Sequence, residues 1–176
     1  IFNYSLKQFR EDRYSKDVKL LQSDLDLKDR VLQAVVISQY RKKVAEQHGI
    51  FVKPVVLVKS NKIAQSEAVF AQFNEWMTNL SAADFEHLKQ THAETVVDRA
   101  FQFFNERGLR DAELVQELQQ DFSDEKRLIV NNKAQSEDNQ LIVNSLEDRS
   151  NPVRIIFAVN KLNEGWDVLN LFDIVR

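Results

Sequence analysis

The sequence predicts an α/β protein whose parallel sheet is covered by helices. Three short apolar runs, at residues 55–58, 128–130 and 153–159, have the near-continuous hydrophobicity of strands that are buried on both faces. Segments with apolar residues at helical spacing lie between them. Strands that alternate with helices favour a parallel sheet, so we expect these three runs to be adjacent parallel strands. A fourth apolar run, Leu171–Val175, comes after the third, beyond a polar stretch.

A helix is predicted before the first strand. Asp24 and Asp26 mark its start, because aspartate accepts hydrogen bonds from the free N–H groups of a first turn and opposes the helix dipole. Gly49 marks its end. Between them, apolar residues recur at helical spacing: Leu27, Val31, Val35 and Tyr40. Residues 1–19 mix aromatic and basic side chains, and we interpret residues 1–52 as a lead-in segment and helix.

The stretch between the first and second strands is long and helical. Residues 81–84 resemble a capping box with aspartate in place of glutamate. Residues 95–107 carry apolar side chains on one broad face, and Asp111 is expected to cap a further helix. A crossover between parallel strands needs far fewer residues, so residues 81–122 are predicted to pack as a helical insert at the periphery of the sheet.

The composition places limits on the class of protein. With 176 residues, 43% of them apolar, the chain is long enough for one domain with a substantial core. The net charge of −3 gives no general attraction to nucleic acid, although a local basic strip remains compatible with it. There is no cysteine, no visible signal peptide and no membrane-spanning run, so we expect a cytoplasmic protein without a membrane partner or a metal site.

A polar cluster comes directly after the third strand and contains Lys161, Glu164, Gly165 and Asp167. Ligands of open α/β sheets bind beyond the carboxyl ends of the strands, so this cluster is a candidate site. The alternative is a structural turn in which Gly165 supplies an unusual backbone angle and Asp167 caps the next element of the chain. Both interpretations fit the residues alone.

A second polar pair, Ser60 and Asn61, ends the first strand. Small hydroxyl and amide side chains beside a helix N-terminus bind phosphates well. The alternative interpretation is that one of them is only the N-cap of the next helix, and the two roles are compatible.

Residues 160–167 resemble motif V of superfamily-two helicases and translocases. Extended to Arg176, the segment is close to the form found in the restriction (Res) subunits of type III restriction-modification enzymes. Residues 55–61 resemble motif IV, the strand that opens the second RecA-like domain of these proteins. The resemblance is strong over residues 153–176 and fair over residues 53–61.

This resemblance implies a three-layer RecA-like (P-loop NTPase-type) fold for residues 53–176, as an incomplete domain that stops before motif VI. The chain starts without methionine and stops after a strand-like run, so we expect a fragment of a longer protein. By position in the motifs, the residues that line the nucleotide cleft would be Glu164, Gly165 and Asp167. The nucleic-acid-binding residues would be Ser60, Asn61, Asn160 and Lys161.

The resemblance also implies a function for the parent protein, an ATP-dependent DNA translocase of a type III restriction endonuclease that uses ATP and Mg²⁺. Its partners would be DNA, a first RecA-like domain, a nuclease domain and the modification (methyltransferase) subunit. The chain has no P-loop, so we expect no catalytic residue in this part and no tight ATP binding by it. Two alternatives are the C-terminal domain of another DNA or RNA helicase, and a non-enzymatic α/β interaction module.

Overall fold

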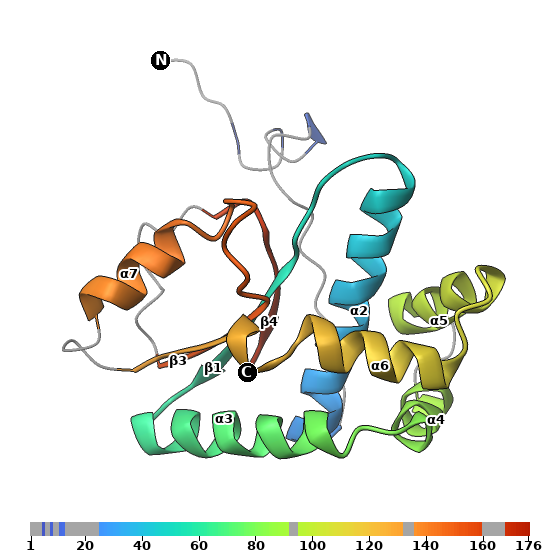
Figure 1. Ribbon diagram of the computed structural model, residues 1–176, viewed down its shortest axis with the longest axis horizontal. Helices are drawn as coiled ribbons and strands as arrows, with labels where there is room; N and C mark the ends of the chain where they lie inside the picture. The colour runs from blue at the N-terminus through green and yellow to red at the C-terminus, as the bar shows by residue number, and fades with distance from the viewer. Residues whose placement is uncertain are drawn as a thin grey trace.

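The computed structural model describes residues 5, 8, 11–12, 25–91, 95–131, 136–159 and 168–176 (Figure 1). Four parallel strands form one sheet in the order β2-β3-β1-β4. The strands are β1 (Val55–Ser60), β2 (Arg127–Val130), β3 (Ile155–Val159) and β4 (Leu171–Val175). The helices are α2 (Leu27–Gln47), α3 (Ile63–Thr78), α4 (Ala82–Thr91), α5 (Val96–Glu106), α6 (Asp111–Asp121) and α7 (Ser136–Asn144). The predicted parallel α/β sheet is confirmed, and so is the adjacency of its first three strands.

Helices cover both faces of the sheet, which gives three layers and two separate cores (Figure 1). The strand residues that pack toward α2 and α3 are Val56, Val58, Ile155, Phe157 and Val175. Those that pack toward α7 are Val55, Leu57, Ile156 and Ala158. This alternation follows from the pleat of a strand, which sends successive side chains to opposite faces. The arrangement is consistent with the RecA-like fold that the resemblance implies.

Helix α2 begins and ends where the sequence predicts. The side chain of Asp26 accepts a hydrogen bond from the Asp29 N–H at 2.9 Å, and Gly49 adopts a φ of 67° after the last turn. The middle of α2 is buried, and it packs on β1 and β4 as part of the core on that face. The division of the chain at residues 52 and 53 stays a prediction, while α2 itself shares the core of the sheet.

The helices α4, α5 and α6 pack mainly on one another and on α2 and α3, at the side of the sheet (Figure 1). At the start of α4, the Ser81 N–H donates to Asp84 at 2.9 Å, as the predicted capping box requires. The cap predicted for α6 is wrong by one residue. Asp111 is the first helical residue, and its carboxylate binds Lys89 of α4 at 2.6 Å instead of capping α6.

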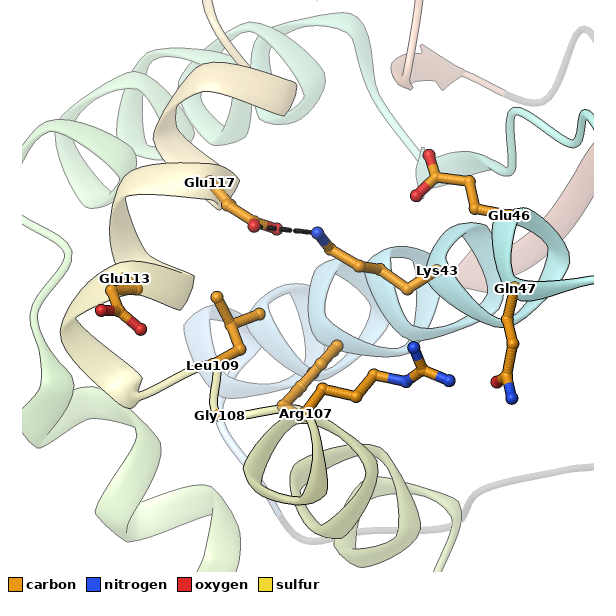
Figure 2. Close-up of a pocket in the computed structure, with 9 residues that line it drawn as sticks. Lys43, Glu46, Gln47, Arg107, Gly108, Leu109, Glu113 and Glu117 are labelled. Atoms are coloured by element: carbon orange, nitrogen blue, oxygen red, sulfur yellow. Dashed lines mark hydrogen bonds and ion pairs between the residues drawn. The ribbon is translucent and has the colours of Figure 1, made fainter.

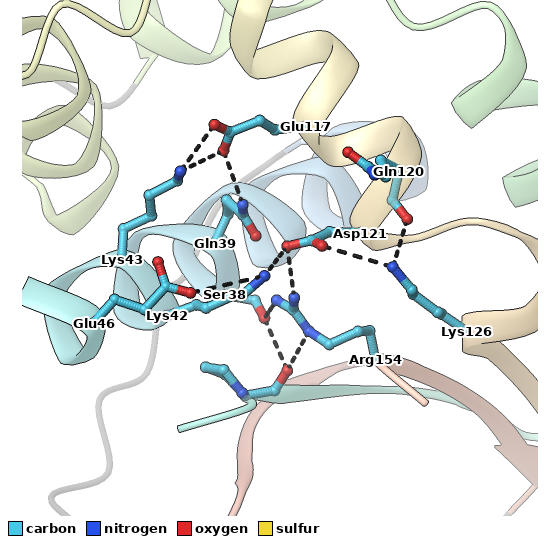
Figure 3. A network of polar contacts seen from close by, with 11 residues as sticks. Ser38, Gln39, Lys42, Lys43, Glu46, Glu117, Gln120, Asp121, Lys126 and Arg154 are labelled. Atoms are coloured by element: carbon cyan, nitrogen blue, oxygen red, sulfur yellow. Dashed lines mark hydrogen bonds and ion pairs between the residues drawn. The ribbon is translucent and has the colours of Figure 1, made fainter. Parts of the chain in front are cut away.

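One buried ion pair joins this helical insert to the sheet (Figure 3). Arg154, just before β3, is only 3% exposed and donates through Nη1 to Asp121 at the end of α6, at 3.0 Å. Its Nη2 donates to the Ser38 hydroxyl of α2 at 3.1 Å, and its Nε donates to the Pro54 carbonyl before β1 at 3.0 Å. Lys42 of α2 also binds the Asp121 carboxylate. Four elements therefore meet at one guanidinium.

We predict that Asp121→Asn lowers the free energy of unfolding at neutral pH by about 3 kcal/mol, because it leaves a buried arginine without its counter-charge. Burial by itself raises the pKa of Asp121, but the hydrogen bond from Lys42 and the charges of Lys42 and Arg154 outweigh it and hold the pKa below the ordinary value of 3.8. A carboxylate with a depressed pKa contributes stability above pH 3.8 that is lost as the pH falls through the folded-state pKa.

The difference between wild type and Asp121→Asn should therefore shrink on acidification, in urea unfolding followed at a series of pH values. The exposed Asp148 provides the matched control, and Asp148→Asn should change little. A loss below about 1 kcal/mol for Asp121→Asn would instead be typical of an exposed ion pair and would contradict the role given to this network.

Candidate functional site

Three strands end together at the carboxyl edge of the sheet. Ser60, the last residue of β1, pairs in register with Val159, the last residue of β3. Val130 of β2 pairs with Ala158, which places Asn131 beside Val159. Ligands of parallel α/β sheets bind at this kind of edge, where the strand order also changes direction. The edge is therefore the candidate site.

Ser60 and Asn61 differ in accessibility. Ser60 is 5% exposed and lies on the face of the sheet that α2 and α3 cover, by alternation from Val56 and Val58. Asn61 is exposed, and its backbone N–H donates to the side-chain oxygen of Gln65 at 3.2 Å. The side chain of Asn61 can therefore contact a ligand directly, whereas the side chain of Ser60 is buried under the helices that cover this face.

The interpretation of Ser60 or Asn61 as an N-cap is wrong. Helix α3 has Lys62 at its N-cap position, and no side chain makes a capping hydrogen bond there. Ser60 still belongs to β1, which places it too early for a cap. The first N–H groups of α3 and the positive end of its dipole thus stay open at the carboxyl edge, beside the exposed cation of Lys62. This combination favours an anionic ligand.

The structure adds one residue that the sequence analysis missed. Asn131 comes directly after β2 and is 6% exposed, and neither Nδ2 nor Oδ1 has a hydrogen-bond partner among the described residues. The hydroxyl of Ser66, in the first turns of α3, is also buried without a partner. The signal in the sequence was present: an asparagine ends the apolar run 128–130 just as polar residues end the other strands.

The remaining predicted site residues lie outside the described residues: Asn160, Lys161, Glu164, Gly165 and Asp167. The structure does describe the residues that flank them. Val159 lies at the carboxyl edge beside Ser60, and Val168 packs against the core under α7. The roles of the residues between them stay predictions.

A hollow lies on the insert, away from the carboxyl edge (Figure 2). It has a volume of about 500 Å³ and lies between the end of α2 and the turn that joins α5 to α6. Two of its carboxylates are already paired: Glu117 binds Lys43 at 2.8 Å, and Glu113 binds Arg110, next to the hollow, at 3.1 Å. None of the predicted site residues lines it. The hollow therefore gives no support to the predicted chemistry.

No helix in the described part of the chain is long and apolar enough to cross a membrane. No group of three or more histidine or carboxylate side chains gathers there in a way that could hold a metal ion.

The fold and this edge define a parallel α/β domain with helices on both faces and an anion-compatible site beyond its strands. The chain is 34% identical, over its whole length, to a probable type III restriction-modification enzyme HindVIP Res subunit of Haemophilus influenzae. It spans 38% of the length of that relative. The resemblance to Res subunits is thereby confirmed. No protein-family model and no solved structure matches the chain.

We predict that Asn61→Ala changes the free energy of unfolding by less than about 0.5 kcal/mol, because the side chain is exposed and caps no helix. Loss of a true N-cap would cost about 1 kcal/mol. Urea unfolding of the wild type and the variant distinguishes these values, and a loss near 1 kcal/mol would restore the capping role.

Proposed function

We propose that this chain is the second RecA-like motor domain of an ATP-dependent DNA translocase, the Res subunit of a type III restriction endonuclease. The observation that carries the proposal is the 34% identity, over the whole chain, to a Res subunit. The parallel sheet and its open carboxyl edge support the same conclusion, because a motor domain of this kind needs a phosphate-binding edge there.

In this proposal, one DNA strand lies across the start of α3. The open N–H groups of its first turn would donate to a phosphate, Lys62 would supply a cation, and Asn61 would add an amide contact. Because the chain as a whole carries a charge of −3, the attraction has to be local to this edge. Binding should therefore depend on salt with a shallow slope that reflects few phosphate contacts.

The nucleotide would bind on the other side of the same loop region. Glu164, Gly165 and Asp167 would face ATP and its Mg²⁺, held between this domain and a first RecA-like domain that carries the P-loop. When bound, ATP would supply the phosphoanhydride bond whose hydrolysis drives the translocation cycle. The role of this chain's residues is to close on the nucleotide and to change their hold on the DNA. The nuclease domain and the modification subunit complete the proposed cytoplasmic enzyme.

The two alternative functions explain fewer of these observations. Another DNA or RNA helicase would have the same edge, but the identity to a Res subunit favours the restriction enzyme. An interaction module without a motor would give no reason for an uncapped helix at the carboxyl edge, since a cap would stabilise it by about 1 kcal/mol.

We predict that Asp167→Ala in the full-length protein abolishes DNA-stimulated ATP hydrolysis and translocation while the domain stays folded. An aspartate at this cleft orders the nucleotide or the partner domain only when the cleft closes, so the effect should appear in turnover. Steady-state ATPase and triplex-displacement assays measure it.

Asp148→Ala is the matched control, because Asp148 is exposed in the turn that precedes β3, at the opposite edge of the sheet. This variant should keep full activity. If Asp167→Ala lowers the melting temperature yet translocates like wild type, Asp167 is a structural cap and this assignment is wrong.

A further inference from the structure

Asn131 is a buried amide whose hydrogen-bonding groups are both unused. Its side chain is 6% exposed, and in the part of the chain that the structure describes neither Nδ2 nor Oδ1 has a hydrogen-bond partner. Nearly all buried polar groups in folded proteins are paired, since an unpaired one keeps the penalty of leaving water without any compensation. An apolar residue of similar size would serve the core better at this position. The unpaired amide therefore suits a contact with a ligand better than it suits packing in the core.

The face on which Asn131 lies follows from the strand before it. Leu128 and Val130 pack toward α7, whereas Ile129 packs toward the core under α2 and α3. Continued alternation places Asn131 on the same face as Ile129, which is the face that α3 covers over β2 and β3. Ser60 ends β1 on this face as well.

The position of Asn131 along α3 can also be derived. Arg127, at the start of β2, donates to the Asn74 side chain of α3 at 2.7 Å. From Arg127 to Asn131 the strand advances about 13 Å. On a helix running the opposite way, that distance corresponds to about nine residues, which leads from Asn74 back to the first turns of α3. Ser66, with its unpaired hydroxyl, lies there. Asn131 thus lies between the sheet and the first turns of α3, near the open N-terminus of that helix.

We propose that Asn131 is a further DNA-binding residue, whose Nδ2 donates to a phosphate oxygen of the strand held at the start of α3. This inference rests on the function proposed above and adds β2 to a site otherwise built from β1 and α3. Asn131 is the first residue beyond its strand, so rotation about its side-chain bonds carries the amide from below α3 to the open edge. This rotation toward DNA is favourable because the amide has no hydrogen bond to break, and it gains one to a charged phosphate.

The test compares two buried amides in the full-length protein. Asn131→Leu removes the amide at the edge. Gln33→Leu is the matched control, because Gln33 is a buried amide with an unpaired Nε2 on α2, which packs over β1 and β4 rather than β2. Affinity is measured by fluorescence anisotropy with a fluorescein-labelled single-stranded oligothymidylate, and local stability by hydrogen exchange of the β2 segment.

Asn131→Leu should weaken DNA binding about tenfold, the typical effect of one lost hydrogen bond to a charged group. Protection of β2 should stay the same or rise, because the variant removes two unpaired polar atoms from the interior. Gln33→Leu should bind DNA like wild type. If the leucine variant does not fold, Asn131→Ala replaces it and should show the same loss of affinity.

Lys62→Glu separates this inference from the function on which it rests. If Lys62→Glu weakens binding while Asn131→Leu binds like wild type, the edge binds DNA and Asn131 is only an unpaired core residue. If neither variant changes the affinity, the DNA site at this edge is itself refuted. A loss for Asn131→Leu that comes with lost protection of β2 would also overturn the inference, because the change would then act through folding.

Discussion

The buried guanidinium of Arg154 is the contact on which the rest of the arrangement depends. A buried charge is tolerated only when it is paired and hydrogen-bonded. Each of the three guanidinium nitrogens of Arg154 donates a hydrogen bond, to a carboxylate, a hydroxyl and a carbonyl from three different elements. The same carboxylate, Asp121, also binds Lys42 of α2. Because these groups come from α2, β1, α6 and the start of β3, satisfying the arginine fixes how the insert lies against the sheet (Figure 3).

This network lies at the amino edge of the sheet, and the two edges differ in their chemistry. At the amino edge the charges of Arg154, Asp121 and Lys42 bind one another. Lys53 also bonds Asn151 there, and burial and the charge of Arg154 lower the pKa of Lys53 to about 8. At the carboxyl edge, α3 starts without a side-chain cap, and the amide of Asn131 has no hydrogen-bond partner in the described part of the chain. An uncapped helix start and an unpaired buried amide both cost local stability, which is a usual signature of a functional site.

The sequence predicted the elements better than the contacts between them. Apolar runs located the strands, and Asp26 and Gly49 located the ends of α2, because these signals are local. The N-cap of α3 was missed because β1 extends through Ser60 and the helix begins only after Lys62. The N-cap of α6 was missed because Asp111 is already helical and binds Lys89. The pairing of Arg154 with Asp121 could not be inferred either, because it joins residues 33 positions apart through the packing of the insert. Asn131 was visible only as one polar residue after a strand, and the five residues predicted between 160 and 167 lie outside the described residues.

The carboxyl edge of this sheet, in our proposal, binds DNA, while the amino edge only holds the fold together. Hydrogen exchange of the full-length protein, with and without single-stranded DNA, tests this division most directly, because backbone N–H groups at the start of α3 are the proposed donors. We expect slower exchange at residues 61–65 and no change at residues 53–54 or 151–154. Slower exchange confined to the hollow on the insert, with none at residues 61–65, would contradict the proposal.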